Sequence, residues 1–234
     1  MRKSRLILLL IFALGLVGLV AQGVVSGSSG GPVGWGLASF IIAVLAVIAF
    51  FFEYQSMAIG SKEIALVAML GTISAAVRIP FAAIPNVQPC TYLIICTGYV
   101  FGPVAGFMVG ALTPLVSNFY LGHGPWTPFE MLAWGMMGVL GAAAGRARVG
   151  TFGLVVLGVV GAFVYGWTIN TWYWASFIYP LTFKTFLVYQ LNSIWFEGFH
   201  AVGNAAFLAF FGTRTIAIME RFRKRFNWQP IAAA

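Results

Sequence analysis

Charged residues and cysteines are scarce in this sequence, and each shortage excludes a class of protein. Only 8% of the 234 residues are charged, whereas an ordinary soluble domain carries about 25%. The chain therefore lacks the polar surface that a soluble protein of this length needs. Its two cysteines are too few for a disulfide framework or a cysteine-based zinc site. The 28 glycines are spread evenly, without a Walker-type motif, so a P-loop nucleotide site is not expected.

The sequence is instead rich in hydrophobic residues, which make up 61% of the chain and gather in long runs. A run of about 20 residues spans a hydrocarbon core of about 30 Å, because a helix rises about 1.5 Å per residue. We therefore predict an all-α membrane protein. The eight predicted spanning segments are Leu6–Val25, Trp35–Phe52, Ile64–Ile84, Thr91–Phe101, Val104–Tyr120, Pro128–Gly145, Gly150–Trp167 and about Thr182–Phe211. The first is interpreted as a retained helix and not as a signal peptide, because a second span follows it immediately.

The short segment Thr91–Phe101 cannot cross a bilayer alone. The chain around Asn86–Cys90 is therefore predicted to dip into the depth of the membrane. Backbone outside a helix is tolerated at that depth only where protein or a water-filled cavity surrounds it. This stretch is accordingly a candidate for lining a pocket, with amide groups from Asn86 and Gln88. The alternative is a rigid turn between two helices, shaped by its prolines.

Basic residues are distributed unevenly between the two sides of the predicted bundle. With a cytoplasmic N-terminus, the basic residues on the inner side are Arg2, Lys3, Arg5, Lys62, Arg146, Arg148, Arg214, Arg221, Arg223, Lys224 and Arg225. Only Arg78 and Lys184 fall near the outer side. Because cytoplasmic loops carry an excess of Lys and Arg, this distribution predicts that both termini are cytoplasmic. It also accounts for the net charge of +8 without a nucleic-acid partner.

A second outward-facing stretch, Asn118–Glu130, ends in a helix start signal. Thr127 is predicted to cap the next helix, with Pro128 at its first position and Glu130 closing a capping box. Glu130 is therefore interpreted as a cap and not as a catalytic acid. His123 stands between two glycines and is either a ligand group or an exposed loop residue.

A third outward-facing stretch, Asn170–Trp174, continues to further aromatic residues at Phe177 and Tyr179. Aromatic side chains at this level are expected as an interfacial belt. So many in one loop could also form a lid over a large flat ligand. Both interpretations place the stretch in a loop at the outer side of the membrane.

The last predicted helix carries a polar stripe made of Gln190, Ser193, Glu197, His200 and Asn204. Steps of three and four residues place all of them on one helix face, over about 21 Å. Polar groups at membrane depth are costly, and by default they face a bundle interior or a cavity. The stripe therefore either fixes helix packing or lines a site. Glu197 needs a partner, such as His200 or a residue on another helix.

Several motifs, in a fixed order along the chain, carry a resemblance to a known family. They are Ala75–Pro80 with Pro85–Pro89, Gly98–Phe107, Leu115–Phe119, Gly124–Pro128 and Met131–Gly135. Together they resemble the substrate-binding S components of energy-coupling factor (ECF) transporters, and most closely the predicted cobalamin-specific branch. The chain departs from that pattern in its extra N-terminal pair of helices, and in His123 and Glu130 where glutamine is expected.

The resemblance implies a six-helix core, which we place within residues 61–234; the additional N-terminal transmembrane hairpin lies within residues 1–60. It implies a multi-pass cell-membrane receptor for a vitamin, cobalamin first, that catalyses no reaction and needs no cofactor or metal of its own. It also implies a transmembrane coupling protein and two cytoplasmic ATPases as partners. The alternatives are another vitamin or corrinoid fragment, an intramembrane enzyme using Glu197 and His200 as acid and base, and autonomous ion-coupled transport.

Two sets of candidate residues follow. The predicted substrate-binding residues, at the outer mouth, are Asn86, Gln88, Cys90, Asn118, His123, Trp126, Trp172, Trp174 and Gln190. The predicted surface for docking the coupling protein, on the first core helix, consists of Ala68, Gly71, Thr72, Ala75 and Ala76. Small residues at this spacing leave a groove where another helix approaches closely, and S components resembling this chain dock through an alanine-x-x-x-alanine face. The alternative is packing within the chain itself.

Overall fold

The computed structural model describes residues 40–41, 43–49, 51–52 and 60–225, and every regular element from residue 60 to residue 225 is a helix. The elements are α3 (Ser61–Phe81), α4 (Pro89–Phe101), α5 (Pro103–Leu121), α6 (Thr127–Arg146), α7 (Thr151–Phe177), α8 (Phe183–Asn192), α9 (Ile194–Phe207), a π-helical turn (Leu208–Gly212) and α10 (Thr213–Arg225). The predicted all-α class is confirmed for this part of the chain. Of the predicted N-terminal hairpin, the first segment lies outside the described residues and the second lies partly outside them.

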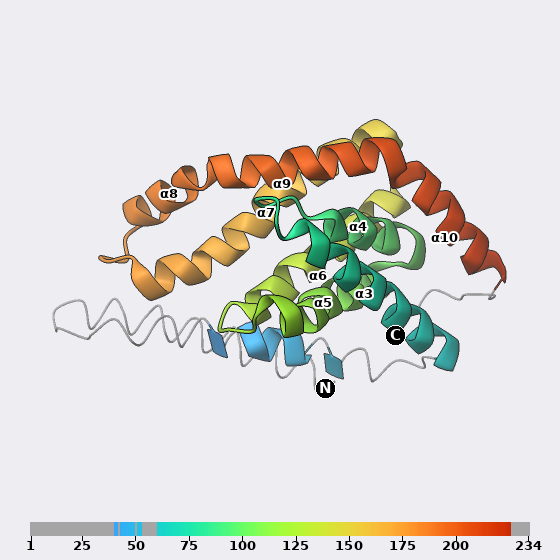
Figure 1. Cartoon of the computed structure of the whole chain (residues 1–234), viewed down its shortest axis with the longest axis horizontal. Coiled ribbons are helices and arrows are strands. Elements are labelled where there is room, and N and C mark those ends of the chain that lie inside the picture. Colours follow the sequence, from blue (N-terminus) through green and yellow to red (C-terminus); the bar gives the residue numbers. More distant parts are fainter. Residues whose placement is uncertain (1–39, 42, 50, 53–59, 226–234) are drawn as a thin grey trace.

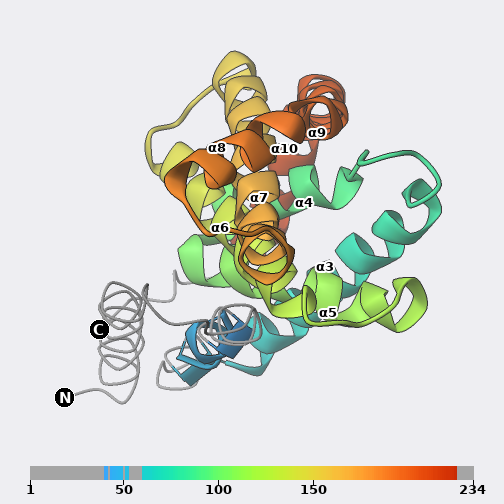
Figure 2. The same cartoon turned by 90° about the vertical axis from the view of Figure 1, so that its left-hand side faces the viewer.

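The helices form a bundle in which consecutive long helices alternate in direction. α5 packs on α4 and α6, α3 packs on α5, and α7 packs on α6 and α9. Figure 1 shows α8, α9 and α10 following one another along one side of the molecule. Figure 2 shows α3 and α5 on the side away from α8. This arrangement brings the last turns of α3 and α5 to the start of α6, and the end of α7 also lies against the start of α6.

A tight turn joins α4 to α5 at the position that the sequence predicts. Gly102 has a φ of 95°, which glycine adopts without steric penalty. Pro103 occupies the first turn of α5, where its missing N–H costs nothing. α4 is apolar but only 13 residues long, as expected for the segment that is too short to span alone.

Within the described residues, four helical stretches are long and apolar enough to cross a membrane: Ser61–Phe81, Pro103–Leu121, Thr151–Phe177 and Ile194–Arg225. The prediction of eight spans is therefore confirmed only in part. The last predicted segment is also interrupted, because α8 ends and α9 begins on either side of Ser193. The Ser193 hydroxyl donates to the carbonyl oxygen of Gln190 at 2.8 Å, and such side-chain bonds to the local backbone compete with helix continuation.

The prediction of a loop at Asn170–Trp174 is wrong. α7 is 27 residues long and includes the whole stretch. Neither glycine nor proline stands between Gly166 and Pro180, so the sequence carries no strong stop signal before the end of α7. The aromatic side chains of this stretch therefore project from a helix.

Glycines let α4, α5 and α6 approach one another closely. Gly98 of α4 and Gly106 of α5 both face Gly138 of α6, and a Cβ atom at any of the three would overlap the backbone of a facing helix. Small residues at helix interfaces allow this close packing in membrane proteins. Gly110, four residues after Gly106 on α5, faces the backbone of α6 at Trp134 in the same way, so both glycines serve packing inside the chain.

Replacing Gly138 with alanine should destabilise the protein by about 1–3 kcal/mol, because the added methyl group overpacks the contact with Gly106. Gly198→Ala is the matched control, since a Cβ atom there meets nothing within 4 Å and alanine favours a helix. Thermal unfolding in detergent measures both variants. A melting temperature of G138A equal to that of the unchanged protein would contradict the close contact.

Candidate functional site

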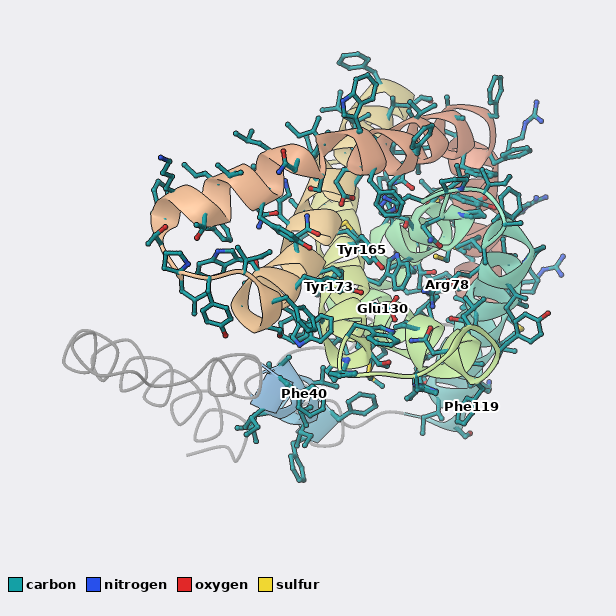
Figure 3. All side chains as sticks on the ribbon, turned by 60° about the vertical axis from the view of Figure 1, so that its left-hand side comes forward. Phe40, Arg78, Phe119, Glu130, Tyr165 and Tyr173 are labelled. Atoms are coloured by element: carbon teal, nitrogen blue, oxygen red, sulfur yellow. The ribbon has the colours of Figure 1, made fainter. Side chains whose placement is uncertain are left out.

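A buried ion pair lies at the end of the bundle where α3, α5 and α6 meet. Arg78, in the last turn of α3, donates from Nη2 to Oε1 of Glu130 at 2.8 Å. Its Nη1 donates to Oγ of Ser117 at 2.7 Å and to Oδ1 of Asn118 at 2.6 Å. The two charged side chains are only 9% and 10% exposed, so each needs the other to offset its desolvation. Figure 3 shows Arg78 and Glu130 beside each other inside the bundle.

Glu130 is fully engaged in this network, and its predicted role in a capping box is wrong. Its Oε2 accepts a hydrogen bond from Nδ2 of Asn118 at 2.6 Å. Thr127 is the first residue of α6 and not its cap; its hydroxyl accepts from Asn118 Nδ2 and from the Gly124 N–H, both at 3.2 Å. The guanidinium offers the carboxylate a full positive charge, whereas a helix N-terminus carries only about half of one, so the buried ion pair is the stronger interaction.

Polar contacts continue from Arg78 to the middle of the bundle. The guanidinium carbon lies 4.6 Å from the centre of the Trp134 ring, within the range of a cation–π interaction. Nε1 of Trp134 donates to Oγ1 of Thr91 at 3.0 Å, and the same hydroxyl lies 2.8 Å from Nε2 of His200. Tyr165 packs against Trp134 and edge-on against His200. Together with Ser117 and Asn118 of α5, the network therefore connects six helices, α3 to α7 and α9.

Several buried polar atoms have no hydrogen-bond partner among the described residues. They are Nε of Arg78, Nδ1 of His200, Oδ1 of Asn204 and Oγ of Ser176. Leaving such a group unsatisfied costs about 1–3 kcal/mol. Two of these atoms belong to the network around Trp134, so its hydrogen-bonding capacity is not exhausted by the protein. These groups are suited to a polar ligand or to water.

The loop between α3 and α4 is fastened to α9. Asn86 is buried and adopts a φ of 51°, a left-handed conformation that asparagine tolerates better than most residues. Its Nδ2 donates to the Phe196 carbonyl oxygen at 2.8 Å and to Oε2 of Glu197 at 3.3 Å. The partner of Glu197 is thus a loop residue, and not His200 or a residue of another helix as predicted.

The polar stripe on the last helices faces protein, as predicted. Its buried members are Gln190, Glu197, His200 and Asn204. Nδ2 of Asn170, on α7, donates to Oε1 of Gln190 at 3.1 Å and to Oγ of Ser193 at 2.7 Å. Nδ2 of Asn204 donates to the carbonyl oxygen of Gly158, also on α7, at 3.0 Å. Hydrogen bonds at both ends of the stripe therefore attach it to α7.

An aromatic group joins the start of α6 to the end of α7. Its members are Trp126, Phe129, Trp172, Tyr173 and Phe177. The ring centre of Trp172 lies 6.1 Å from that of Trp126, 6.3 Å from that of Phe129 and 4.5 Å from that of Tyr173. Trp172 is buried, whereas Trp126 is half-buried. The group lies at the same end of the bundle as the Arg78–Glu130 pair, because Phe129 and Glu130 are neighbours in α6.

The structure brings some of the predicted substrate-binding residues together and separates others. Asn86 and Asn118 belong to the buried contacts just described, Trp126 and Trp172 belong to the aromatic group, and Gln190 bonds to α7. At the start of α4, Sγ of the buried Cys90 lies 4.0 Å from Oε1 of Gln88. His123 is exposed, with its ring edge-on to Phe119. Trp174 turns to α8, where its Nε1 donates to Oγ1 of Thr185 at 3.1 Å.

Sequence reasoning did not identify Arg78, Thr91 or Trp134 as site residues. A signal was available for Arg78, because an ionisable residue inside an apolar segment points to a functional site by default. Thr91 and Trp134 carry no comparable signal, since an isolated threonine or tryptophan is common in membrane helices. Their position in the network depends on how α4 and α6 pack.

Comparison with known families supplies one match. The family model described as "ECF transporter, substrate-specific component" matches residues 62–213, which is well over half of the 234-residue chain. The matched residues include α3 to α9 and the π-helical turn. No curated protein matches the chain, and no solved structure does.

Proposed function

Because the chain belongs to the family of substrate-specific components of ECF transporters and is a multi-pass membrane protein, we propose that it captures a vitamin outside the cell. The family is a transporter component and not an enzyme. In the proposed role, the chain binds its ligand without ATP and passes it to a transmembrane coupling protein. Two cytoplasmic ATPases supply the energy, and both termini of the chain lie in the cytoplasm.

One observation carries the proposed site. The buried Arg78–Glu130 network and the aromatic group lie together, at the end of the bundle formed by the last turns of α3, α5 and α7. The exposed basic residues Arg146, at the end of α6, and Arg148, in the turn before α7, lie at the other end. Since basic residues gather on the cytoplasmic side, this arrangement supports an outward-facing site.

The chemistry of the site supports a large, flat ligand with polar edges, and we propose cobalamin. Aromatic rings of α6 and α7 offer apolar contact for a corrin ring. Amides such as those of Asn86 and Gln190 could meet its carboxamide groups, since binding sites combine apolar walls with a few placed polar groups. Another vitamin or a corrinoid fragment is the nearest alternative. Nε of Arg78 has no partner among the described residues and favours a ligand that accepts a hydrogen bond at its rim.

The contacts of Glu197 and His200 favour a receptor over an intramembrane enzyme. Glu197 bonds to Asn86, whereas His200 bonds to Thr91. An acid–base pair needs both groups within hydrogen-bond reach of one reacting proton. Each of these groups instead links a different segment of the bundle.

The purified chain should bind cobalamin in detergent without ATP, with an affinity tighter than micromolar. Isothermal titration calorimetry with several vitamins, and the absorbance spectrum of any co-purified ligand, measure this. Trp126→Ala should weaken binding by about 1 kcal/mol or more, because a ring that contacts the ligand is lost. The matched control is Trp195→Ala, whose side chain is 85% exposed on α9. Tight binding of a different vitamin would refute cobalamin as the ligand but not the receptor function. If Trp126→Ala and Trp195→Ala weakened binding equally, the binding site would not lie at the aromatic group.

A further inference from the structure

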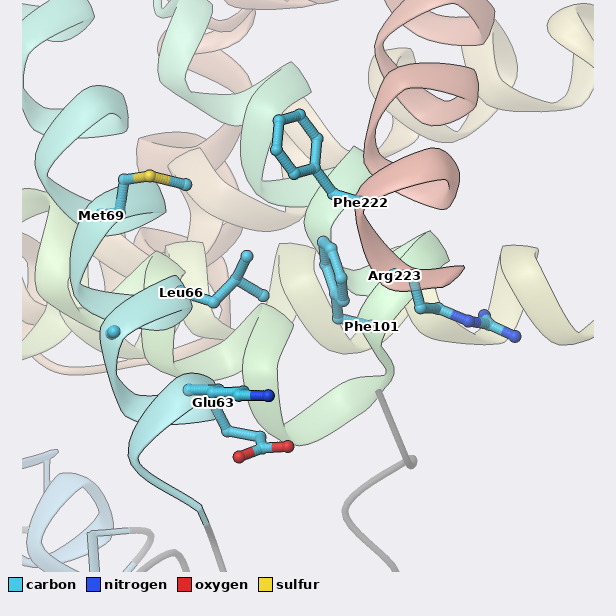
Figure 4. Close-up of a pocket in the computed structure, with 8 residues that line it drawn as sticks. Glu63, Leu66, Met69, Phe101, Phe222 and Arg223 are labelled. Carbon is cyan, nitrogen blue, oxygen red and sulfur yellow. The ribbon is translucent and has the colours of Figure 1, made fainter. Parts of the chain in front are cut away.

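A concave surface lies at the end of the bundle opposite the Arg78–Glu130 pair, between α3, α4 and α10. This cavity has a volume of about 240 Å³. Its wall consists of Ala65, Leu66, Met69, Phe101 and Phe222, with Lys62, Glu63 and Arg223 also lining it. Figure 4 shows Leu66 and Met69 of α3 facing Phe101 and Phe222 across the cavity. The wall is apolar, and the charged residues belong to the ends of two helices.

A smaller cavity, of about 160 Å³, lies on the neighbouring face of α10. It is lined by Ile218, Arg221, Phe222 and Arg225, which share one helix face because they are three, four and seven residues apart. Phe222 lines both cavities. The larger, apolar cavity, called the apolar groove below, therefore adjoins the smaller cavity with its two arginines, and Phe222 separates them.

α10 is held in place on its inner side and exposed on its outer side. Nη1 of Arg223 donates to the carbonyl oxygen of Val100, in the last turn of α4, at 2.8 Å. Ile216 and Met219 are buried, whereas Ile218 and Phe222 are 47% and 44% exposed. The exposed side of the helix therefore carries large apolar groups next to arginines.

The charge at the end of α10 indicates that these arginines lie at the membrane surface. α10 turns away from α9 beyond the π-helical turn (Figure 1), and its last turn carries Arg223, Lys224 and Arg225. Because charged side chains are costly inside the hydrocarbon core, we expect this end of α10 in the headgroup layer. In the proposed orientation this is the cytoplasmic leaflet, whose lipids carry negative charge.

We propose that this surface binds an anionic phospholipid, with an acyl chain along the apolar groove and the phosphate at Arg221 and Arg225. The charges next to the two cavities favour an anion: Lys62, Arg221, Arg223, Lys224 and Arg225 outnumber Glu63 and Glu220. The groove alone would fit any acyl chain. The adjoining arginines make the surface selective for a negatively charged headgroup, as basic pockets at this level of a membrane protein are.

The test compares phosphatidylglycerol with phosphatidylcholine of identical acyl chains, added to the purified full chain in detergent. Native mass spectrometry counts the bound lipids, and a thermal shift reports their affinity. Phosphatidylglycerol should bind and stabilise, phosphatidylcholine should do so far less, and inorganic phosphate alone should do neither. Arg221→Gln with Arg225→Gln should weaken phosphatidylglycerol binding about thirtyfold, since each basic residue near an anionic lipid surface contributes about 1 kcal/mol and every 1.4 kcal/mol corresponds to about a factor of ten.

Matched variants separate a site from general electrostatics. Arg146→Gln with Arg148→Gln removes two exposed cations elsewhere and should leave binding unchanged. Arg221→Lys with Arg225→Lys should retain most of the phosphatidylglycerol binding. Leu66→Trp fills the groove without changing the charge and should lower the affinity for phosphatidylglycerol. Size-exclusion profiles and lipid-free melting temperatures establish that each variant is folded.

Three results would overturn the proposal. The first is equal binding of both lipids, and the second is an equal loss in the Arg146/Arg148 variant. The third is unchanged lipid binding in the Arg221/Arg225 variant together with loss of a co-purifying coupling protein, which would assign the surface to that partner. The vitamin affinity of the same samples is read separately, so failure here leaves the receptor function untouched.

Discussion

Replacing Arg78 with methionine should lower the free energy of unfolding by about 3–5 kcal/mol, because Glu130 is then left as a buried charge without its cation. Arg78 donates to Glu130, Ser117 and Asn118 at once, so the substitution removes every charged hydrogen bond that holds the end of α3 to α5 and α6. Thermal and denaturant unfolding of the purified protein in detergent measures the loss.

A double variant distinguishes the ion pair from simple loss of packing. Arg78→Met combined with Glu130→Gln removes both charges, and replacing a whole buried pair is often close to neutral. The double variant should therefore recover much of the stability that Arg78→Met loses. Arg214→Met, at an exposed position of α10, is the matched control and should change little. If R78M alone were as stable as the control, the pair would not hold the helices together.

The sequence predicts much of the helical framework, because long apolar runs leave few alternatives. The turn at Gly102 and Pro103 and the inward orientation of the polar stripe both follow from local residue types and spacing. The end of α7 cannot be predicted in this way, because an aromatic stretch at a membrane interface is compatible with a loop and with a helix. The interruption at Ser193 is equally hard to foresee, since serine often occurs inside membrane helices.

The candidate site depends on contacts between residues far apart in sequence. Arg78 and Glu130 are separated by 52 positions, and Thr91 and His200 by 109. The sequence predicts that a buried charge has a partner, but the partner depends on which helices pack together. Spacing alone supports only a local interaction, and for this reason the sequence predicts a capping box that includes Glu130. The exposed position of His123 depends in the same way on the path of a loop.

The structure also divides the predicted docking surface on α3. Ala68, Thr72 and Ala76 are exposed, whereas Gly71 and Ala75 are buried. A Cβ atom at Gly71 would approach Leu112 of α5 to 3.0 Å, so that residue serves packing within the chain. Oγ1 of Thr72 donates to the Ala68 carbonyl oxygen at 2.8 Å and therefore needs no other partner. The exposed three leave a shallow, apolar strip along the helix.

Tryptophan at Ala68 or at Thr72 should abolish ATP-dependent vitamin uptake while leaving vitamin binding intact. Small residues at a spacing of four allow another helix to approach closely, and an indole group would hold the coupling protein away. The proposed vitamin site should be unaffected, because we place it at the far end of α3, near Arg78. Three measurements separate the effects. Uptake into cells or proteoliposomes measures transport, co-purification measures docking of the coupling protein, and calorimetry of the isolated chain measures vitamin binding.

Ala206→Trp, at an exposed position of α9, is the matched control and should support normal uptake. Unimpaired uptake in both α3 variants would place the docking surface elsewhere, and loss of vitamin binding would show that this strip supports the fold itself.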